Sequence, residues 1–463
     1  MSISYKKIKQ IVGPLLFLKN EHDVKYGEIV KIRTDDNKER TGQVVKMNEN
    51  LIIIESFEET TGLSSENAEI IFTGDSFRLK ISKDMIGRTF NSLGKPIDIK
   101  TKKELESGIL TDIEREIDGI PINPFAREYP SEVIQTGISV IDGLFTLIRG
   151  QKLPIFSGQG LPHNKLAAQI VTQAKVLTGE PFLIIFCGIG IIQDDAIYFL
   201  NRFQESGNIQ NIISFINFAE DPIMERLIIP RVALTTAEYF AFEKDMQVLV
   251  ILIDMTNYAE ALRELSSAKE EIPSRKGYPG YLYSDFASIY ERTGKIKGKK
   301  GSITQIPILT MPNDDITHPI PDTSGYITEG QLVLSRNLHK KNLYPPLDVL
   351  ASISRLMKDA IGKQNTREDH ADISSQLLAS YSSALEVRDL ISILGEEGLS
   401  LNQKATLKFG DDFEKKFLNQ GLGENRNFSK TLTLAWEILS NLEKNQLFRI
   451  HKKFIDKYYP ELV

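Results

Sequence analysis

The chain contains very little cysteine and no long apolar segment. Cys187 is the only cysteine among 463 residues, so no disulfide can form within the chain, as is typical of a reducing cytoplasm. The apolar runs at residues 182–187 and 248–253 are far shorter than the roughly 20 residues that cross a bilayer. The N-terminus also lacks the apolar core of a signal peptide. We therefore expect a cytoplasmic protein without a membrane span.

Excess positive charge is absent as well. The net charge is −6, whereas dedicated nucleic-acid binders usually carry a basic face. We therefore expect no nucleic-acid partner. The length and the 41% hydrophobic content allow large cores and roughly two to three or more domains.

The most informative absence lies in residues 157–165, Ser-Gly-Gln-Gly-Leu-Pro-His-Asn-Lys, which we call the degenerate loop. A phosphate-binding loop reads G-x-x-x-x-G-K-[ST]. Aligned from Gly158, His163 replaces the last glycine, Asn164 the lysine and Lys165 the hydroxyl residue. The missing lysine would bind the β- and γ-phosphates, and the missing hydroxyl would bind Mg²⁺. The pattern predicts a nucleotide-binding architecture without hydrolysis at its own site.

The candidate nucleotide-contacting residues are therefore those of the degenerate loop, and we expect weak or no nucleotide binding by them: Gly158, Gly160, Pro162, His163, Asn164 and Lys165. The alternative is an ordinary glycine turn before a helix. His163 could be a pH switch or a metal ligand, but no Cys or His lies near it, so a structural role is favoured. Lys165 either attracts a phosphate or points into solvent or an interface. We predict no metal site and no tightly bound cofactor.

Asp254 follows the apolar run 248–253. A carboxylate at the end of a buried strand, beside a phosphate loop, is where Mg²⁺ is commonly organised, although many such residues only cap turns. The run 183–186 leads into Cys187-Gly-Ile-Gly-Ile-Ile, with no acidic group before Asp194. A residue that activates water is therefore missing from the strand end near Ile189. Like the missing lysine and hydroxyl of the degenerate loop, this absence predicts a site without hydrolysis.

Three kinds of pattern follow one another along the chain, and they predict three domains, at residues 1–75, 76–357 and 358–463. The first contains short β-type segments typical of a small antiparallel β-barrel, which either binds a ligand or holds neighbouring chains. We favour the second role. The expected strands are residues 8–12, 15–18, 28–33, 42–47, 51–56 and 68–72.

The second domain alternates apolar strands with amphipathic helices, which predicts an α/β fold with a parallel sheet covered on both faces. Leu166, Ile170 and Ala174 mark the sheet-facing side of the helix after the degenerate loop. The third domain is predicted to be helical, with a Thr366–Asp369 capping box and an apolar stripe from Ile373 onward. The expected strands of the second domain are residues 152–156, 183–186, 212–218, 248–253, 303–310 and 327–334.

Several motifs together resemble the head subunits of rotary ATPases, and Gly158-Gln-Gly-Leu-Pro-His-Asn164 resembles the non-catalytic B (beta) chain of the V-type and A-type enzymes. The resemblance covers essentially the whole chain. The other matching segments are residues 136–142, Arg149-Gly-Gln-Lys152, 254–263, 277–283, 317–322, 325–330 and 345–350.

The resemblance implies a RecA-like central domain and a ring in which catalytic A chains alternate with B chains. It implies further partners: a central rotor stalk, a peripheral stalk and, indirectly, a membrane sector that moves H⁺ or Na⁺. ATP or ADP with Mg²⁺ would bind at the interface with the A chain. The complex would be attached to the cytoplasmic face of the membrane.

The family's B chain contributes an arginine to the neighbouring site, and the matching motif is Ser352-Ile-Ser354-Arg355-Leu356. Arg355 is therefore the expected arginine finger in trans; without the resemblance, a structural salt bridge is an equal alternative. Ala351 stands where the family usually has proline, which predicts a less stiff approach to Arg355. Residues 270–273 would face the rotor, or form a solvated charged loop. The alternative function is a self-sufficient ring ATPase of the secretion or flagellar export type.

Overall fold

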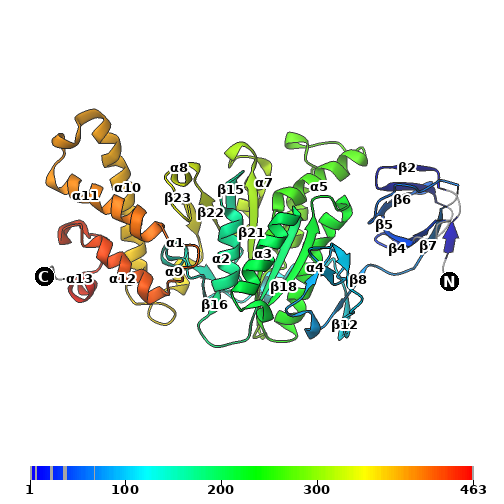
Figure 1. Cartoon of the computed structure of the whole chain (residues 1–463), viewed down its shortest axis with the longest axis horizontal. Coiled ribbons are helices and arrows are strands. Elements are labelled where there is room, and N and C mark those ends of the chain that lie inside the picture. Colours follow the sequence, from blue (N-terminus) through cyan, green and yellow to red (C-terminus); the bar gives the residue numbers. More distant parts are fainter. Residues whose placement is uncertain (1–2, 6–7, 21–23, 35–38, 67, 461–463) are drawn as a thin grey trace.

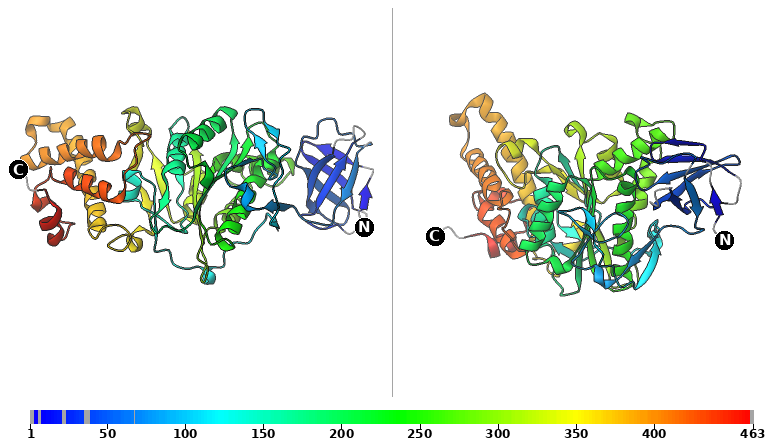
Figure 2. Two further views of the ribbon diagram at one scale, coloured as in Figure 1. Left: turned by 60° about the horizontal axis from the view of Figure 1, so that its bottom comes forward. Right: turned by 45° about the vertical axis from the view of Figure 1, so that its right-hand side comes forward.

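Three structural parts follow one another along an elongated molecule. The computed structural model describes residues 3–5, 8–20, 24–34, 39–66 and 68–460. The N-terminal barrel and the C-terminal helices lie at opposite ends, on either side of the α/β part (Figures 1 and 2). The predicted fold class of barrel, parallel-sheet domain and helical domain is confirmed. Within the described ranges, no helix is long and apolar enough to span a membrane.

The N-terminal part is a curled antiparallel sheet of seven strands in the order β1-β7-β4-β5-β6-β3-β2. Its interior is filled by alternate aliphatic side chains, such as Leu16, Leu18, Ile52 and Ile54, as the two-residue period of a strand requires. The six predicted strands are present, with small shifts at their ends. The strands are β1 Ile3–Tyr5, β2 Gln10–Val12, β3 Leu15–Lys19, β4 Ile29–Arg33, β5 Glu39–Met47, β6 Leu51–Ser56 and β7 Glu69–Phe72.

The central sheet has nine strands, eight of them in the order β23-β22-β15-β21-β19-β17-β18-β9, and β20 pairs with β21. All pairs are parallel except β22–β23 and β20–β21. The strands are β9 Thr89–Phe90, β15 Ile155–Gly158, β17 Phe182–Ile191, β18 Ile212–Phe218, β19 Gln247–Ile253, β20 Gly294–Lys295, β21 Ser302–Met311, β22 Gly330–Leu334 and β23 Leu347–Ser354.

Helices cover both faces of this sheet. Leu249 and Ile251 of β19 belong to the core that includes α2 and α3, whereas Val248 and Val250 belong to the core that includes α4, α5 and α6. Alternate residues of one strand are thus buried on opposite faces. The helices of this part are α1 Ser139–Leu144, α2 His163–Gln173, α3 Gln193–Glu205, α4 Ile223–Phe242, α5 Met255–Ala268, α6 Leu282–Tyr290, α7 Pro319–Ile327, α8 Arg336–Lys340 and α9 Met357–Ala360.

Some predicted boundaries in the central domain were wrong for identifiable reasons. The strand expected at residues 152–156 begins only at Ile155, because Pro154 has no N–H to donate to a ladder. The strand expected from residue 327 begins at Gly330, because Ile327 ends α7. Ala174 caps the end of α2 instead of lying within it.

Small sheets complete the central part, and helices form the C-terminal part. The short strands are β8 Arg78–Ile81 with β12 Ile113–Glu116, β10 Ile97–Asp98 with β11 Lys103–Glu104, and β13 Val133–Gln135 with β14 Leu147–Ile148 and β16 Lys175–Val176. The C-terminal helices are α10 His370–Leu394, α11 Leu401–Asp412, α12 Phe428–Leu439 and α13 Lys452–Tyr458, with a π-helical turn at Phe413–Leu418.

The predicted Thr366–Asp369 capping box is wrong. Asp369 is the N-cap of α10 but makes no side-chain capping bond, because its carboxylate accepts hydrogen bonds from Arg367 and from the indole of Trp436, at 2.8 Å from Trp436 Nε1. The Thr366 hydroxyl lies 3.0 Å from His370 Nδ1. His370 Nε2 lies 3.0 Å from the Gly143 carbonyl oxygen, which can only accept, so Nε2 carries the proton.

Burial lowers the pKa of His370 to about 4, because a charged imidazole is costly away from water. A base whose pKa is depressed by folding stabilises the fold above its unfolded pKa, near 6.5, and loses that contribution as the pH falls toward 4. His370 joins α10 to α1. Protonation of His370 at low pH should therefore weaken the packing of the C-terminal helices on the central part.

We predict that His370→Gln weakens the pH dependence of unfolding. Between pH 7 and pH 4, the wild type should lose about 2–3 kcal/mol more unfolding free energy than the variant. Urea unfolding followed by fluorescence of Trp436 measures this, because that side chain is buried beside Asp369. His339 is exposed, and His339→Gln should retain the wild-type pH dependence. Equal pH profiles for His370→Gln and the wild type would contradict the assignment.

Candidate functional site

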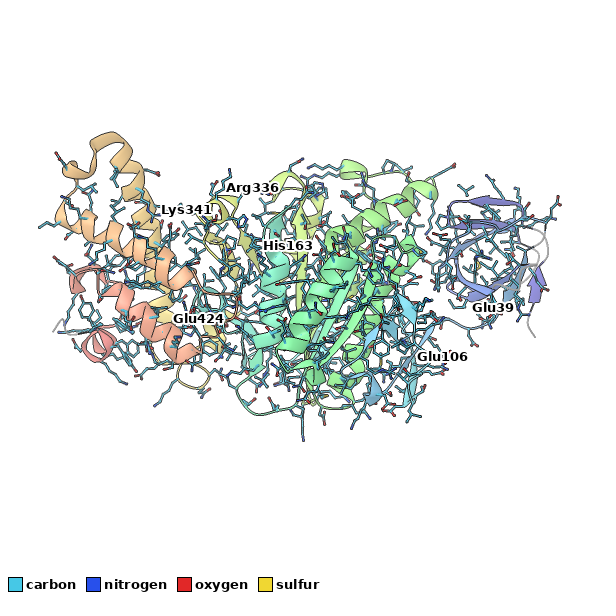
Figure 3. The ribbon with its side chains drawn as sticks, viewed as in Figure 1. Glu39, Glu106, His163, Arg336, Lys341 and Glu424 are labelled. Carbon is cyan, nitrogen blue, oxygen red and sulfur yellow. The ribbon has the colours of Figure 1, made fainter. Side chains whose placement is uncertain are left out.

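The degenerate loop lies at the edge of the sheet where the parallel strands end, which we call the carboxyl edge. Strand β15 ends at Gly158 and α2 begins at His163, so the connection has the strand–loop–helix form of a phosphate loop. Figure 3 shows His163 at the start of α2. The backbone architecture of a nucleotide site is therefore present, and its side chains decide what it can do.

Inside the degenerate loop, the His163 side chain contacts Ser157, which lies in strand β15. Its Nδ1 lies 2.9 Å from the hydroxyl of the fully buried Ser157. Burial lowers the pKa of His163, and the nearby carboxylates of Asp254 and Asp195 oppose that shift. The imidazole therefore occupies space that a phosphate loop leaves open with glycine.

Asn164 is hydrogen-bonded to the carboxylate of Asp195 on α3. Burial raises the pKa of Asp195, whereas this bond lowers it. Sequence reasoning missed Asp195, because its approach to the loop depends on how α3 packs beside α2. Strand β17 continues through Ile189 and ends at Ile191, further along than the sequence predicted, and none of its residues is acidic.

An ion pair from two other elements closes over the start of the loop, and no pattern in the sequence signals it. Arg336 of α8 binds both carboxylate oxygens of Asp314, at 2.5 and 2.9 Å, and donates to the Gln159 carbonyl at 2.9 Å. A Cβ on Gly158 would lie 2.0 Å from Asp314 Oδ1. A side chain at 158 would therefore displace this pair from its position over the loop. Figure 3 shows Arg336 at the same edge as His163.

Asp254 makes the contacts of a helix cap. Its Oδ1 accepts from Thr256 N at 2.7 Å and from Thr310 N at 3.1 Å, and its Oδ2 accepts from the Thr310 hydroxyl. The first bond caps α5, and the others tie α5 to the end of β21. Both oxygens are thus engaged with the protein.

These residues do not fit a magnesium-bound nucleotide. Mg²⁺ is held by oxygen ligands, including a loop hydroxyl, and that position carries the exposed ammonium of Lys165. Asn164 is neutral, and both oxygens of Asp254 are bound to α5 and β21. In the described part of the chain, no group of three or more His, Cys, Asp or Glu is arranged for a metal ion.

Arg355 lies at the opposite edge of the sheet. It directly follows β23, which pairs antiparallel with β22 so that Ser354 faces Gly330 at the start of β22. Because β22 runs parallel to β15, Arg355 lies where the parallel strands begin, the amino edge. The structure therefore does not bring Arg355 and the degenerate loop together.

The Arg355 side chain is exposed. Its Nη1 donates to the Thr328 carbonyl at 2.8 Å, and it makes no ion pair with a carboxylate in the described ranges. The salt-bridge alternative finds no support in these contacts. Most of the guanidinium's five donors remain available to a ligand from outside the chain.

The strand that leads to Arg355 is held by Asp348 instead of by a proline. Asp348 Oδ1 accepts from the N–H groups of Leu350 and Ala351, each at 3.1 Å. A proline at 351 has no N–H and could not make the second bond. The loss of stiffness expected from Ala351 is therefore offset by this carboxylate.

Comparison with known proteins agrees with this architecture in all three parts. Residues 8–74 match the beta-barrel domain of the ATP synthase alpha/beta family, residues 137–354 match its nucleotide-binding domain, and residues 359–459 match the C-terminal domain of V and A type ATP synthase.

Two curated relatives match nearly the full length of the chain. The B subunit of the A-type ATP synthase of Aeropyrum pernix is 54% identical over 99% of this chain and 98% of its own length. The V-type ATP synthase beta chain of Halothermothrix orenii is 53% identical over 98% and 97%. A solved structure of an ATP synthase subunit, NeqB from Nanoarcheaum equitans, is 42% identical with a TM-score of 0.73, covering 92% of this chain and 98% of that one. The chain therefore belongs to the ATP synthase alpha/beta family, as a B (beta) subunit of the A-type and V-type branch.

We predict that restoring the loop sequence does not create an ATPase. Replacing His163-Asn164-Lys165 by Gly-Lys-Thr removes the bonds to Ser157 and Asp195, but it leaves the ion pair on Gly158 and supplies no carboxylate near Ile189. Phosphate release by the isolated triple variant should stay at background, with circular dichroism confirming the fold. Turnover of about 1 s⁻¹ or above, within the range of ordinary enzymes, would contradict this prediction.

Proposed function

We propose that this chain is the non-catalytic B subunit of an A/V-type rotary ATPase or ATP synthase, and that it completes the nucleotide site of a neighbouring catalytic A subunit with Arg355. The observation that carries the proposal is the exposed position of Arg355, at the sheet edge opposite to the chain's own degenerate loop. A group that cannot reach its own loop is free to serve the site of the next chain in a ring.

Arg355 suits this role chemically. A guanidinium stays charged and can bind two phosphate oxygens at once. As the neighbour's site closes, Arg355 would stabilise the negative charge that develops on the transferred phosphoryl group, an effect of about 10³–10⁵ in rate in comparable systems. The chemistry of water attack would belong to the A subunit, because the degenerate loop does not fit a magnesium-bound nucleotide.

Family membership supports the proposal of a wider assembly. Alternating A and B subunits would form a ring around a central rotor stalk, held by a peripheral stalk and coupled to H⁺ or Na⁺ movement in a membrane sector. Rotor angle would open and close the A–B interfaces. By analogy, residues 270–273 in the loop after α5, where the Ile272 side chain is 92% accessible, would face the rotor. The self-sufficient ring ATPase is disfavoured, because it would need an intact loop.

The isolated chain should show negligible ATPase activity. Neither Asn164 nor Lys165 can bind phosphate and Mg²⁺ as a catalytic loop does, so phosphate release from purified chain should equal the buffer blank. Turnover that survives purification of the chain alone, and that scales with its concentration, would overturn the non-catalytic assignment.

In a complex reconstituted with the catalytic partner, Arg355→Ala should lower kcat by about 10³-fold or more while assembly remains intact by size-exclusion chromatography. Arg355→Lys keeps the charge but not the planar fork, so it should recover only part of the rate. Lys358 is an exposed cation three positions further along, and Lys358→Ala should leave kcat within about twofold. Wild-type activity in Arg355→Ala would refute the finger.

A further inference from the structure

Gln151 is a fully buried amide whose side chain reaches the end of β23. It belongs to the Arg149-Gly-Gln-Lys152 motif, to which the proposed function gives no role. Its Oε1 accepts from Ile148 N at 3.0 Å. Its Nε2 donates to the Ser354 hydroxyl at 3.0 Å and to the Glu329 carbonyl at 3.4 Å. Both donors of the amide are thus used. One acceptor belongs to Ser354, which precedes Arg355 in the sequence, and the other to Glu329, whose carbonyl also accepts from Arg355 N.

The same segment binds Arg355 directly. Arg355 N donates to the Glu329 carbonyl at 2.9 Å, and its Nη1 donates to the Thr328 carbonyl at 2.8 Å. Residues 328–329 therefore set both the backbone and the guanidinium of Arg355. Gln151 contacts Glu329, which directly precedes β22, and Ser354, which ends β23.

The acceptors are themselves fixed. The Glu329 carboxylate accepts from Lys152 N at 2.8 Å and pairs with Lys152 Nζ at 2.6 Å, and Lys152 is 2% exposed. A Cβ on Gly330 would lie 2.3 Å from the Ile353 carbonyl oxygen, so glycine allows β22 and β23 to approach closely here. The backbone from which Arg355 projects is therefore held by several contacts.

We propose that Gln151 is a positioning residue for Arg355: by tying Ser354 to Glu329, it fixes the direction in which the guanidinium leaves the amino edge. This inference rests on the proposed function of Arg355. Gln151 is fully buried, so it acts through its neighbours. A reacting group displaced by about 1 Å can lose about 10²-fold in rate, so a small shift at the end of β23 is enough to be measured.

The test is Gln151→Leu in the complex with the catalytic partner, because leucine removes both donors at similar size. We expect kcat to fall about tenfold while KM changes less than about twofold, since ground-state nucleotide binding belongs to the partner. Gln247→Leu is the matched control. Gln247 is 2% exposed at the start of β19, and it bonds to the Lys300 carbonyl at 2.9 Å and the Ser302 hydroxyl at 2.5 Å. It should keep kcat within about twofold.

Combination with Arg355→Ala separates positioning from general damage. If Gln151 acts through Arg355, the double variant should be no slower than Arg355→Ala alone. A further fall of about tenfold in the double variant, or an equal fall in Gln247→Leu, would show a structural effect and overturn the proposal.

Ser354→Ala provides a second and milder variant, which decides the question if Gln151→Leu does not assemble. It removes the hydroxyl that Gln151 binds, together with the bond from that hydroxyl to the Thr146 carbonyl at 3.3 Å, and kcat should fall severalfold with KM unchanged. If Arg355→Ala lowers kcat but neither Ser354→Ala nor an assembled Gln151→Leu does, positioning by Gln151 fails and the finger stands. If Arg355→Ala itself has no effect, the proposed function fails.

Discussion

The antiparallel pairing of β23 with β22 is the constraint on which the rest of the site depends. Every other pair along the ordered path of the central sheet is parallel, and parallel strands deliver their loops to the carboxyl edge. By running the other way, β23 returns the chain to the amino edge and leaves Arg355 there. Arg355 and the degenerate loop therefore lie at opposite edges of one sheet, as the proposed role of Arg355 at a neighbour's site requires.

The degenerate loop keeps a structural role at the carboxyl edge. Its helix α2 joins the sheet to the C-terminal helices through Gln169, whose Nε2 donates to the carbonyls of Gly421 and Glu424 at 3.3 and 3.2 Å. The Tyr344 hydroxyl donates to Gln169 Oε1 at 2.9 Å. With Arg336 bound to Gln159 at the other end, the loop and its helix are fixed to neighbouring elements. These contacts make the loop and α2 part of the framework between the sheet and the C-terminal part of the chain.

The sequence predicted the elements well, because apolar runs of the right length identify strands that are buried on both faces. Residues 212–218 were expected as a strand and form β18 with the same bounds. The strand expected at residues 183–186 was too short, because β17 runs from Phe182 through Gly188 and Gly190 to Ile191. Thr366 misled the prediction at α10, because its hydroxyl binds His370, a contact that depends on tertiary packing.

The same limit applies to the site. The altered loop could be recognised from consecutive residues, and Arg355 from a resemblance to known motifs. The approach of Asp195, Arg336 and Asp314 to the loop could not, because each comes from a different element whose position is fixed only by packing. Gln151 stood within a recognised motif, but its link to Ser354 spans 203 positions in the sequence.

The most direct test of the account is a structure of the assembled ring with nucleotide bound at a closed A–B interface. We predict that the Arg355 guanidinium lies within hydrogen-bonding distance, about 3 Å, of a terminal phosphate oxygen held by the neighbouring A subunit, and that the phosphate sits on that neighbour's loop. A nucleotide phosphate bound on residues 157–165 of this chain, with Arg355 directed into solvent, would contradict the account.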